Sequence, residues 1–384
     1  MTLKAISALR IFDGEKMHHE SALLWQENHI VSIVPENRIP THAEVIRYPS
    51  STLTPGFIDL QVNGGGGVMF NEQTDVTGIE TICNAHRKHG TAYLLPTLIS
   101  DSQEKIKQAL QAANAALKNK TKGVLGVHLE GPWLSPEKNG AHDTRYFYAP
   151  SVESLKALPW LSQGRTLVTL APETVDTEAV HWLSRQGVLV SCGHSNASAQ
   201  QLSGDKLSYI DGFTHLYNAM SPLTGRDPGV VGTALMTDHA WCSVITDGIH
   251  VAPKNVMLAH RVKPKGKLLI VSDAMASVGS ENNSFILNNE IISVIDNKLT
   301  NSNGSLAGAH IGMDQSVANV IKWGVDEQEA FKMASTYPAH ALRSARSLGY
   351  LKTGFIAAAT ILNSDYQAQA VLVDGEIFPN VTGL

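Results

Sequence analysis

The chain has 384 residues, of which 43% are hydrophobic and 17% charged, and its formal net charge is −5. These values allow a large buried core, and the scattered basic residues exclude a dedicated nucleic-acid or membrane surface. Three widely separated cysteines form neither a disulfide framework nor a thiolate metal site. No signal-peptide pattern and no membrane-length apolar run is present, so we expect a soluble, cytoplasmic protein.

The two ends of the chain share a β-rich texture. Residues 1–53 contain short strand-like runs separated by turn signals such as Asp13-Gly14. The same texture returns in residues 353–384, where Asp374-Gly375 separates two apolar runs. Because chain ends often lie close together, we expect one small β-sandwich domain from residues 1–53 plus 353–384. Residues 54–352 would then form the second domain.

The central region alternates between strand-like and helical patterns. Strands are expected at residues 57–60, 92–95, 124–129, 166–170, 188–192, 213–216, 242–246 and 268–272. Helices are expected at 76–89, 102–117, 152–158, 178–186, 197–202, 314–323, 327–335 and 339–348. About eight βα units predict an α/β fold of the TIM type, a (β/α)8 barrel. An open doubly wound sheet is the alternative, but no G-x-G-x-x-G or phosphate-loop signature follows the first strand.

Polar side chains stand where five of these strands end. They are Gln61 and Asn63 after the first strand, then Glu130, His194, His215 and Asp273 at the ends of four later ones. In a barrel such positions converge on one mouth. A single strand-end histidine is more often a hydrogen-bonded core residue, and Glu130 alone could cap the next segment or pair with an arginine. The combination is much harder to attribute to chance.

This set of residue types suits metal-dependent hydrolysis. Two imidazoles and a carboxylate suit zinc, and three protein ligands leave a fourth position for water. We expect Glu130, His194 and His215 to hold one divalent metal per subunit, with zinc the favoured ion. Asp273 is then the general base, a free carboxylate that takes a proton and passes it to the leaving group. The alternative for Asp273 is a helix N-cap before Ala274.

These residues lie in motifs that resemble the N-acetylglucosamine-6-phosphate deacetylase family of the amidohydrolase superfamily. The matching stretches run in family order and cover most of the chain. They are P-G-F-I-D at 55–59, H-L-E-G-P at 128–132, G-A-H at 140–142, G-H-S at 193–195, T-H-L-Y-N-A-M at 214–220, G-R at 225–226, D-G-I-H at 247–250 and S-D-A at 272–274. The segment 214–220 followed by G-R is the most specific of them.

The resemblance implies hydrolysis of the acetamide of N-acetyl-D-glucosamine 6-phosphate to D-glucosamine 6-phosphate and acetate, in amino-sugar catabolism. Carried over by position, Glu130, His194 and His215 are metal ligands, and Asp273 is the catalytic acid/base, with His142 as a second catalytic residue. The substrate-binding positions would be Gln61, Asn63, Ala141, His142, Asn218, Ala219, Arg226 and His250. The family also implies a homodimer, or a dimer of dimers, in which Arg226 reaches the neighbouring site; the subunit that supplies His250 stays open.

Some features depart from the family pattern or leave alternatives open. Gln61-Val-Asn63 stands where many superfamily members have H-x-H, and an amide is a poor zinc ligand, so one metal is expected. Met275 occupies a position where threonine is common in relatives. Taken alone, Arg226 reads as a surface arginine paired with Asp227. The alternative functions are deacetylation of N-acetylgalactosamine 6-phosphate, hydrolysis of a cyclic amide, or binding by a catalytically inactive barrel.

Overall fold

The centre of the molecule is a barrel of parallel strands. The computed structural model describes residues 2–288, 290–301, 304 and 306–380. Eight strands follow one another in the order β14-β13-β12-β11-β10-β9-β8-β5, and a parallel bridge between Val62 and Ala274 joins the two ends of the sheet. The strands are β5 (Phe57–Val62), β8 (Thr91–Ile99), β9 (Gly126–Glu130), β10 (Arg165–Leu170), β11 (Leu189–Cys192), β12 (Gly212–Phe213), β13 (Trp241–Ile245) and β14 (Leu268–Val271). The expected TIM-type barrel is confirmed.

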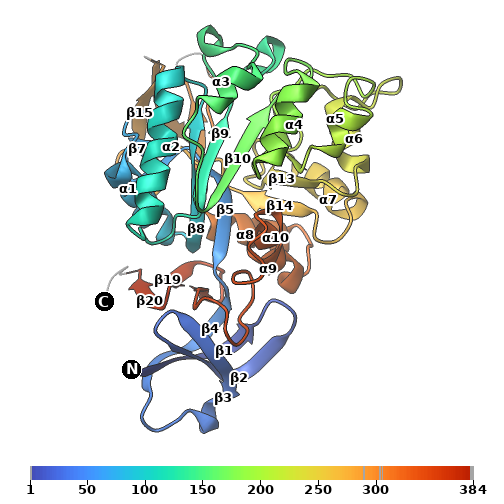
Figure 1. Ribbon diagram of the computed structural model, residues 1–384. Helices are drawn as coiled ribbons and strands as arrows, with labels where there is room; N and C mark the ends of the chain where they lie inside the picture. The colour runs from blue at the N-terminus through green and yellow to red at the C-terminus, as the bar shows by residue number, and fades with distance from the viewer. Residues whose placement is uncertain (1, 289, 302–303, 305, 381–384) are drawn as a thin grey trace.

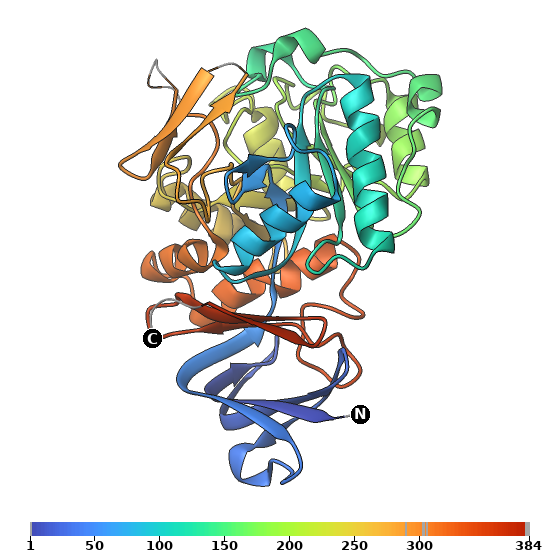
Figure 2. The ribbon, with the colours of Figure 1, turned by 90° about the vertical axis from the view of Figure 1, so that its left-hand side faces the viewer.

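Helices cover the outside of the barrel (Figures 1 and 2). They are α1 (Val76–Arg87), α2 (Gln103–Lys118), α3 (Val152–Lys156), α4 (Thr177–Arg185), α5 (Asp205–Ser208), α6 (Gly229–Met236), α7 (Pro253–Val262), α8 (Met313–Lys322), α9 (Glu327–Ala334) and α10 (Thr336–Ala341). Local sequence explains where they begin: the Asp75 and Ser102 side chains accept hydrogen bonds from the backbone amides of Gly78 and Lys105. None of the described helices is long and apolar enough to cross a membrane.

Several elements differ from expectation. The helix expected at residues 197–202 is wrong, because turns occupy this segment. The Ser198 side chain takes a backbone bond that a helix would need: its Oγ accepts from Gln201 N, which in a helix would donate to the carbonyl of Ala197. The sequence analysis also missed α6, α7 and a small antiparallel sheet of β15 (Ser284–Leu287), β16 (Glu290–Ile295) and β17 (Lys298–Thr300). This small sheet lies at the upper rim of the barrel (Figure 2).

Both ends of the chain build one mixed sheet below the barrel (Figure 1). Its order is β20-β19-β18-β4-β1-β2-β3, with β1 (Leu3–Phe12), β2 (Met17–Gln26), β3 (His29–Pro35), β4 (Glu44–Pro55), β18 (Ala359–Leu362), β19 (Ala368–Val373) and β20 (Glu376–Pro379). Antiparallel pairing of β18 with β4, where Ile361 lies opposite Leu53, joins the two ends. The expected β unit from both termini is thus confirmed. Its boundaries at residues 53 and 353 stay a prediction, and residues 381–384 lie outside the described part.

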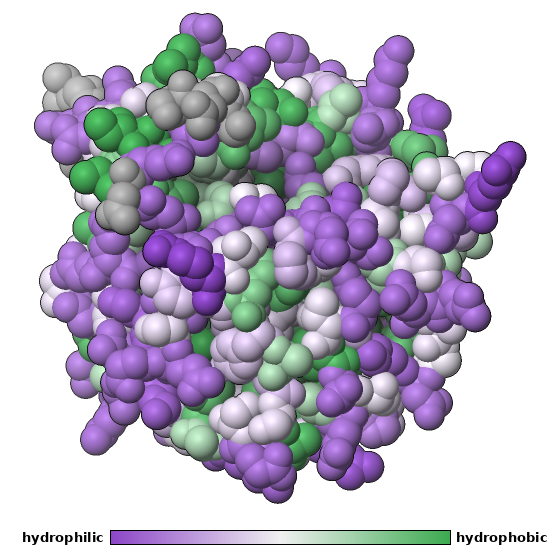
Figure 3. All heavy atoms as spheres, turned by 90° about the horizontal axis from the view of Figure 1, so that it is seen from above, coloured by the Kyte–Doolittle hydropathy of each residue, from purple (hydrophilic) through white to green (hydrophobic). Residues whose placement is uncertain are grey.

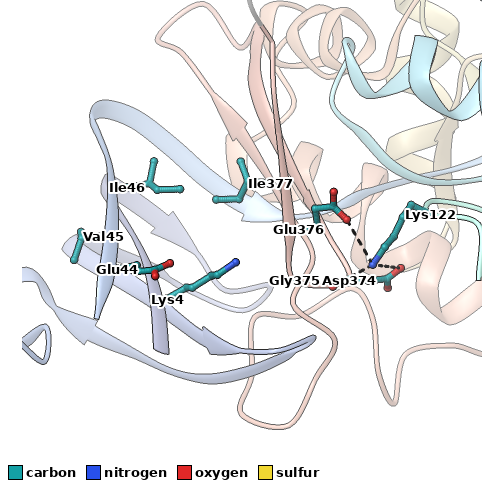
Figure 4. A pocket seen from close by; sticks show the side chains of 9 residues that line it. All are labelled: Lys4, Glu44, Val45, Ile46, Lys122, Asp374, Gly375, Glu376 and Ile377. Carbon is teal, nitrogen blue, oxygen red and sulfur yellow. Dashed lines mark hydrogen bonds and ion pairs between the residues drawn. The ribbon is translucent and has the colours of Figure 1, made fainter. Parts of the chain in front are cut away.

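A pocket of about 570 Å³ lies between residues 44–46 of β4 and the β19–β20 turn of this terminal sheet. Figure 4 shows Ile46 of β4 and Ile377 of β20 on its opposite walls. At its edge, Lys122 of the barrel lies 3.9 Å from Asp374 and 4.0 Å from Glu376. These contacts hold the β19–β20 hairpin against the barrel. The pocket lies on the side of the molecule away from the barrel mouth, and none of the strand-end residues lines it.

A buried carboxyl group links the first barrel strand, β5, to the last one, β14. Asp59 of β5 is fully buried, and its Oδ1 accepts hydrogen bonds from Gln61 N and from Ser272 N, both at 3.2 Å. Ser272 follows the last strand, so one side chain ties the first strand to the last. Burial raises the pKa of Asp59 to about 7, although a hydrogen bond from the Ser272 side chain opposes the shift.

The raised pKa of Asp59 predicts a pH-dependent stability. Between its ordinary value of 3.8 and about 7, the unfolded chain has released this proton while the folded chain still holds it. The free energy of unfolding therefore falls as pH rises through this window. Above the window, the loss of stability from ionising the buried Asp59 carboxyl group is complete. Asp59→Asn keeps an oxygen for both amides and cannot ionise. We expect the variant to lose less thermal stability than the parent between about pH 5 and pH 8, measured by calorimetry. Asp238→Asn, at an exposed position, is the control, and equal losses in parent and Asp59→Asn would contradict the prediction.

Candidate active site

Three strand ends bring a carboxylate and two imidazoles into contact. Glu130 is the last residue of β9, His194 follows β11, and His215 follows β12; all three are buried. Glu130 Oε1 lies 3.0 Å from His215 Nε2 and 3.3 Å from His194 Nε2, and the two Nε2 atoms are 3.0 Å apart. The strands share one direction, so residues at their carboxyl ends converge at the barrel mouth.

The backbone at this mouth is held in an uncommon conformation. His194, His215 and Asp273 have φ angles of +48°, +37° and +52°, in the left-handed region that non-glycine residues rarely adopt. Each such residue costs about 1–3 kcal/mol and persists only where the surrounding structure enforces the conformation. Clustering of this strain at three strand ends is typical of a functional site.

The cluster of Glu130, His194 and His215 fits a divalent cation. Each residue offers one ligand atom, and the three atoms lie within 4.8 Å of one another. His194 Nδ1 lies 2.7 Å from the carbonyl oxygen of Lys138, a bond that fixes the imidazole with Nε2 free toward the cluster. Although burial opposes the shift, hydrogen bonds from the two histidines hold the pKa of Glu130 well below its usual range. Two imidazoles and an ionised carboxylate form a donor set suited to zinc.

Asp273 lies beside this cluster and has two amide partners. Asn63 Nδ2 donates to its Oδ1 at 2.7 Å, and Gln61 Nε2 donates to the same oxygen at 3.0 Å. Gln61 Nε2 also donates to Glu130 Oε1 at 2.9 Å, so this amide links the two carboxylates. Burial, followed by the charge of Glu130, raises the pKa of Asp273 to about 6. A carboxyl group with this pKa is suited to exchange protons near neutral pH.

His142 presents a defined hydrogen-bond donor to the same space. Its Nδ1 accepts from the backbone amide of Ser100 at 3.1 Å and lies 2.7 Å from the Ser100 hydroxyl. A backbone amide can only donate, so Nδ1 carries no proton and the hydrogen of the neutral ring is on Nε2. That Nε2 lies 3.9 Å from Glu130 Oε2. Burial, followed by the charge of His194, holds the pKa of His142 well below its usual range, which keeps the ring neutral.

The structure brings most of the expected site residues around one cavity of about 210 Å³. Those lining it are Asn63, Glu130, Ala141, His142, His194, His215, Asn218, Ala219, His250 and Asp273. His250 Nδ1 lies 2.6 Å from Asp247 Oδ2, which orients its ring. Gln61 does not line the cavity; its amide instead supports the two carboxylates from below.

Arg226 is not brought to the cavity of its own chain. It lies exposed in the loop before α6, and no ion pair of its guanidinium occurs within the described ranges. Asp227, the expected partner, instead accepts from the backbone amides of Ala199 and Gly229. No lysine or arginine is among the described residues that line the cavity. A phosphorylated ligand would therefore lack a cationic partner from this chain alone.

The sequence analysis missed the apolar residues of the cavity, which are Ile99, Met275, Leu306 and Gly308. Ile99 ends β8, but the strand expected at residues 92–95 stops four residues before it, so the rule that located Glu130 did not reach Ile99. Leu306 and Gly308 follow the small sheet β15–β17, which the sequence did not reveal. No sequence signal marked these two positions.

Comparisons with known proteins agree with this geometry. Residues 52–378 match the model of the amidohydrolase family. The chain is 37% identical to N-acetylgalactosamine-6-phosphate deacetylase of Shewanella sp. (strain ANA-3), over 86% of this chain and 84% of that one. It is 34% identical to N-acetylglucosamine-6-phosphate deacetylase of Haemophilus influenzae, over 90% and 92%. The crystal structure of N-acetylglucosamine-6-phosphate deacetylase from Pasteurella multocida superposes with a TM-score of 0.92 at 35% identity, covering 98% of this chain and all of that one. The chain therefore belongs to the amidohydrolase family and, within it, to the group of sugar-phosphate deacetylases.

Proposed function

We propose that the protein hydrolyses the acetamide of N-acetyl-D-glucosamine 6-phosphate, giving D-glucosamine 6-phosphate and acetate. The observation that carries the proposal is the convergence of Glu130, His194, His215 and Asp273 on one cavity of an amidohydrolase barrel. The segment 214–220 followed by Gly225-Arg226 is the motif that most specifically resembles the N-acetylglucosamine-6-phosphate deacetylases. The 37% identity to an N-acetylgalactosamine-6-phosphate deacetylase makes N-acetylgalactosamine 6-phosphate the second candidate.

Acetate release tests the proposal directly. Purified protein loaded with Zn²⁺ is given the two epimeric 6-phosphates separately, and kcat/KM is measured for each. The proposal expects turnover of both, with the gluco epimer preferred. A preference for the galacto epimer would select the second candidate. Absence of acetate from both would refute the proposed activity.

Glu130, His194 and His215 are the residues that would hold the cation, which we propose to be a single zinc ion. A zinc ion bound there would polarise the acetamide carbonyl and lower the pKa of a water molecule. Both amide partners of Asp273 donate to Oδ1, and no hydrogen bond to Oδ2 occurs among the described residues. That oxygen is available to take a proton from the attacking water and to return it to the departing amine.

His142 would act on the carbonyl oxygen of the acetamide. Its Nε2–H can donate to the carbonyl oxygen as negative charge develops there, and a fixed donor in a buried site is effective because it needs no reorganisation. The ring is held by Ser100, so the donor keeps its position through the reaction. Asn218, Ala219 and His250 line the same cavity, and we expect the first and last side chains and the backbone amide of Ala219 to contact the sugar phosphate.

We propose that Arg226 of a second subunit in a homodimer completes the phosphate-binding site. A phosphomonoester prefers bidentate contacts from arginine, and the cavity has no cation of its own among the described residues that line it. The exposed loop that carries Arg226 also carries Leu223, which is 58% exposed, and the nearby Met236 is 75% exposed. Contact between copies through this face would cover both apolar side chains.

Arg226→Ala is expected to raise KM for the phosphorylated substrate about tenfold or more, since hydrogen bonds to charged groups contribute about 1.5–3 kcal/mol. Unphosphorylated N-acetylglucosamine should show no comparable change. The exposed Arg346→Ala is the matched control. An unchanged preference for the phosphorylated sugar would contradict the role of Arg226.

Mixing two variants that are each impaired at low substrate concentration tests whether Arg226 acts across subunits. A heterodimer of Arg226→Ala and Asp273→Asn chains contains one pocket with an intact Asp273, and the other chain supplies its Arg226. We expect mixed chains, after dissociation and reassociation, to regain activity at low substrate concentration. An arginine acting within its own chain would give no recovery. Light scattering measures the oligomeric state in the same samples.

A further inference from the structure

The cavity has one polar side and one apolar side. The carboxylates and imidazoles form the polar side, whereas Ile99, Met275 and Leu306 supply apolar surface. Ile99 and Met275 are 4% and 2% exposed, so both are fixed by packing, while Leu306 is 42% exposed at the rim. The deep part of the apolar side therefore consists of Ile99 and Met275.

These two side chains are placed by the same strand ends that place the reactive groups. Ile99 of β8 lies opposite Glu130 of β9 in the parallel ladder. Met275 comes two residues after Asp273, and its backbone amide donates to the carbonyl of Ala309. Ile99 and Met275 belong to one apolar cluster, against which Ala141 packs beside His142. The apolar wall thus runs from the neighbour of Glu130 to the neighbour of Asp273.

The chemistry of amide hydrolysis indicates which part of a substrate would contact this apolar wall. The oxygen of water adds to the acyl carbon, the carbon–nitrogen bond breaks, and the products are a carboxylate and a protonated amine. The alkyl group stays on the acyl carbon throughout, so it must lie within one bond of the reacting atom. Near Glu130, Asp273 and His142, the buried apolar surface is that of Ile99 and Met275. Resting on the proposed function, we infer that Ile99 and Met275 bind the acyl group, and that Met275 restricts it to acetyl.

The Met275 side chain packs against the backbone of Gly308, which limits its movement away from the cavity. A Cβ atom at Gly308 would lie 2.4 Å from Met275 Cε and 2.5 Å from its Cγ, so the side chain already packs directly on this backbone. Gly308 has φ +74°, which further favours glycine. The methionine therefore fills the space beside the glycine and leaves no room for a longer acyl chain. Shortening this one side chain should open that room.

Acyl-chain selectivity tests the inference. The N-formyl, N-acetyl, N-propionyl and N-butyryl derivatives of glucosamine 6-phosphate are compared with the zinc-loaded parent and with Met275→Ala. One methylene in an apolar pocket changes kcat/KM about 10–200-fold. We expect the propionyl-to-acetyl ratio of kcat/KM to rise by about this factor in Met275→Ala, and the butyryl-to-acetyl ratio to rise further. The zinc content should stay at the parent level.

Met333→Ala is the matched control, because Met333 of α9 is also fully buried but lies in the barrel core away from the cavity. It should leave the acyl ratios unchanged. Met275→Val keeps a buried apolar side chain and should change the acyl ratios in the same direction. It replaces the alanine variant in the test if that variant does not fold. Acyl ratios within about twofold of the parent in the folded variants overturn the inference. Absence of acetate release by the parent from either epimer overturns the proposed function itself, so the two failures are distinct.

Discussion

Asp273→Asn is expected to lower kcat by about 10²–10⁴-fold, the range that a positioned general acid–base residue contributes. The amide cannot accept the proton of the attacking water or return it to the amine. Since Asp273 is not among the three clustered ligands, the variant should bind as much zinc as the parent. Acetate release measures kcat, and elemental analysis measures the metal.

The pH profile gives this prediction a second readout. Burial raises the pKa of Asp273 to about 6, so below this pH the group is increasingly protonated and cannot act as a base. The parent's kcat/KM should therefore rise with pH through about 6, and the asparagine variant should lack that limb. Asp314→Asn, at a mostly buried aspartate outside the cavity, is the control. A variant that keeps more than about a tenth of the parent's kcat would remove Asp273 from the catalytic role.

His194→Ala should weaken metal binding by more than about 100-fold, since loss of even an outer partner of a ligand costs about 10–100-fold. Removing one of the three clustered groups leaves Glu130 and His215, which are too few for a stable zinc site. Elemental analysis after dialysis should show about one zinc per parent chain and little in the variant. Activity should fall in parallel.

Thermal unfolding separates lost metal from a lost fold. A ligand that binds only the folded state raises its stability, so Zn²⁺ should raise the melting temperature of chelator-treated parent. The same addition should have little effect on His194→Ala. His181→Ala, on α4 and outside the cluster, should respond like the parent. Zinc occupancy of His194→Ala equal to that of the parent would refute the ligand assignment.

The reactive residues could be located from sequence because of one regularity of parallel sheets. The run Val124–Leu129 ends at Glu130, and the short run before Gly193 ends near His194. Strands that point the same way in a barrel must deliver such residues to the same mouth. The structure brings Glu130, His194, His215 and Asp273 together as expected. Their catalytic and ligand roles await the variants described above.

Other features depended on contacts between residues far apart in the chain. The wrong helix at 197–202 arose because apolar periodicity ignores side-chain bonds to the backbone, such as that of Ser198. That Gln61 contacts the substrate stays a prediction, and the folded molecule adds that its amide donates hydrogen bonds to Glu130 and Asp273. The position of Met275 in the cavity wall depends on its packing with Ile99 and Gly308, which come from distant segments.

The sequence alone was enough to predict the barrel strands, most of the helices, the shared β unit of the two termini and the chemical identity of the strand-end residues, but it did not reveal α6, α7 or the sheet β15–β17. Hydrophobic periodicity and strand direction are local properties, so they can be read along the chain. Three features required the folded molecule: the hydrogen bonds that orient His142 and Asp273, the position of Arg226 outside the cavity of its own chain, and the set of apolar side chains that line this cavity. Those features depend on distances between segments that are far apart in sequence, and closure of the barrel sets these distances.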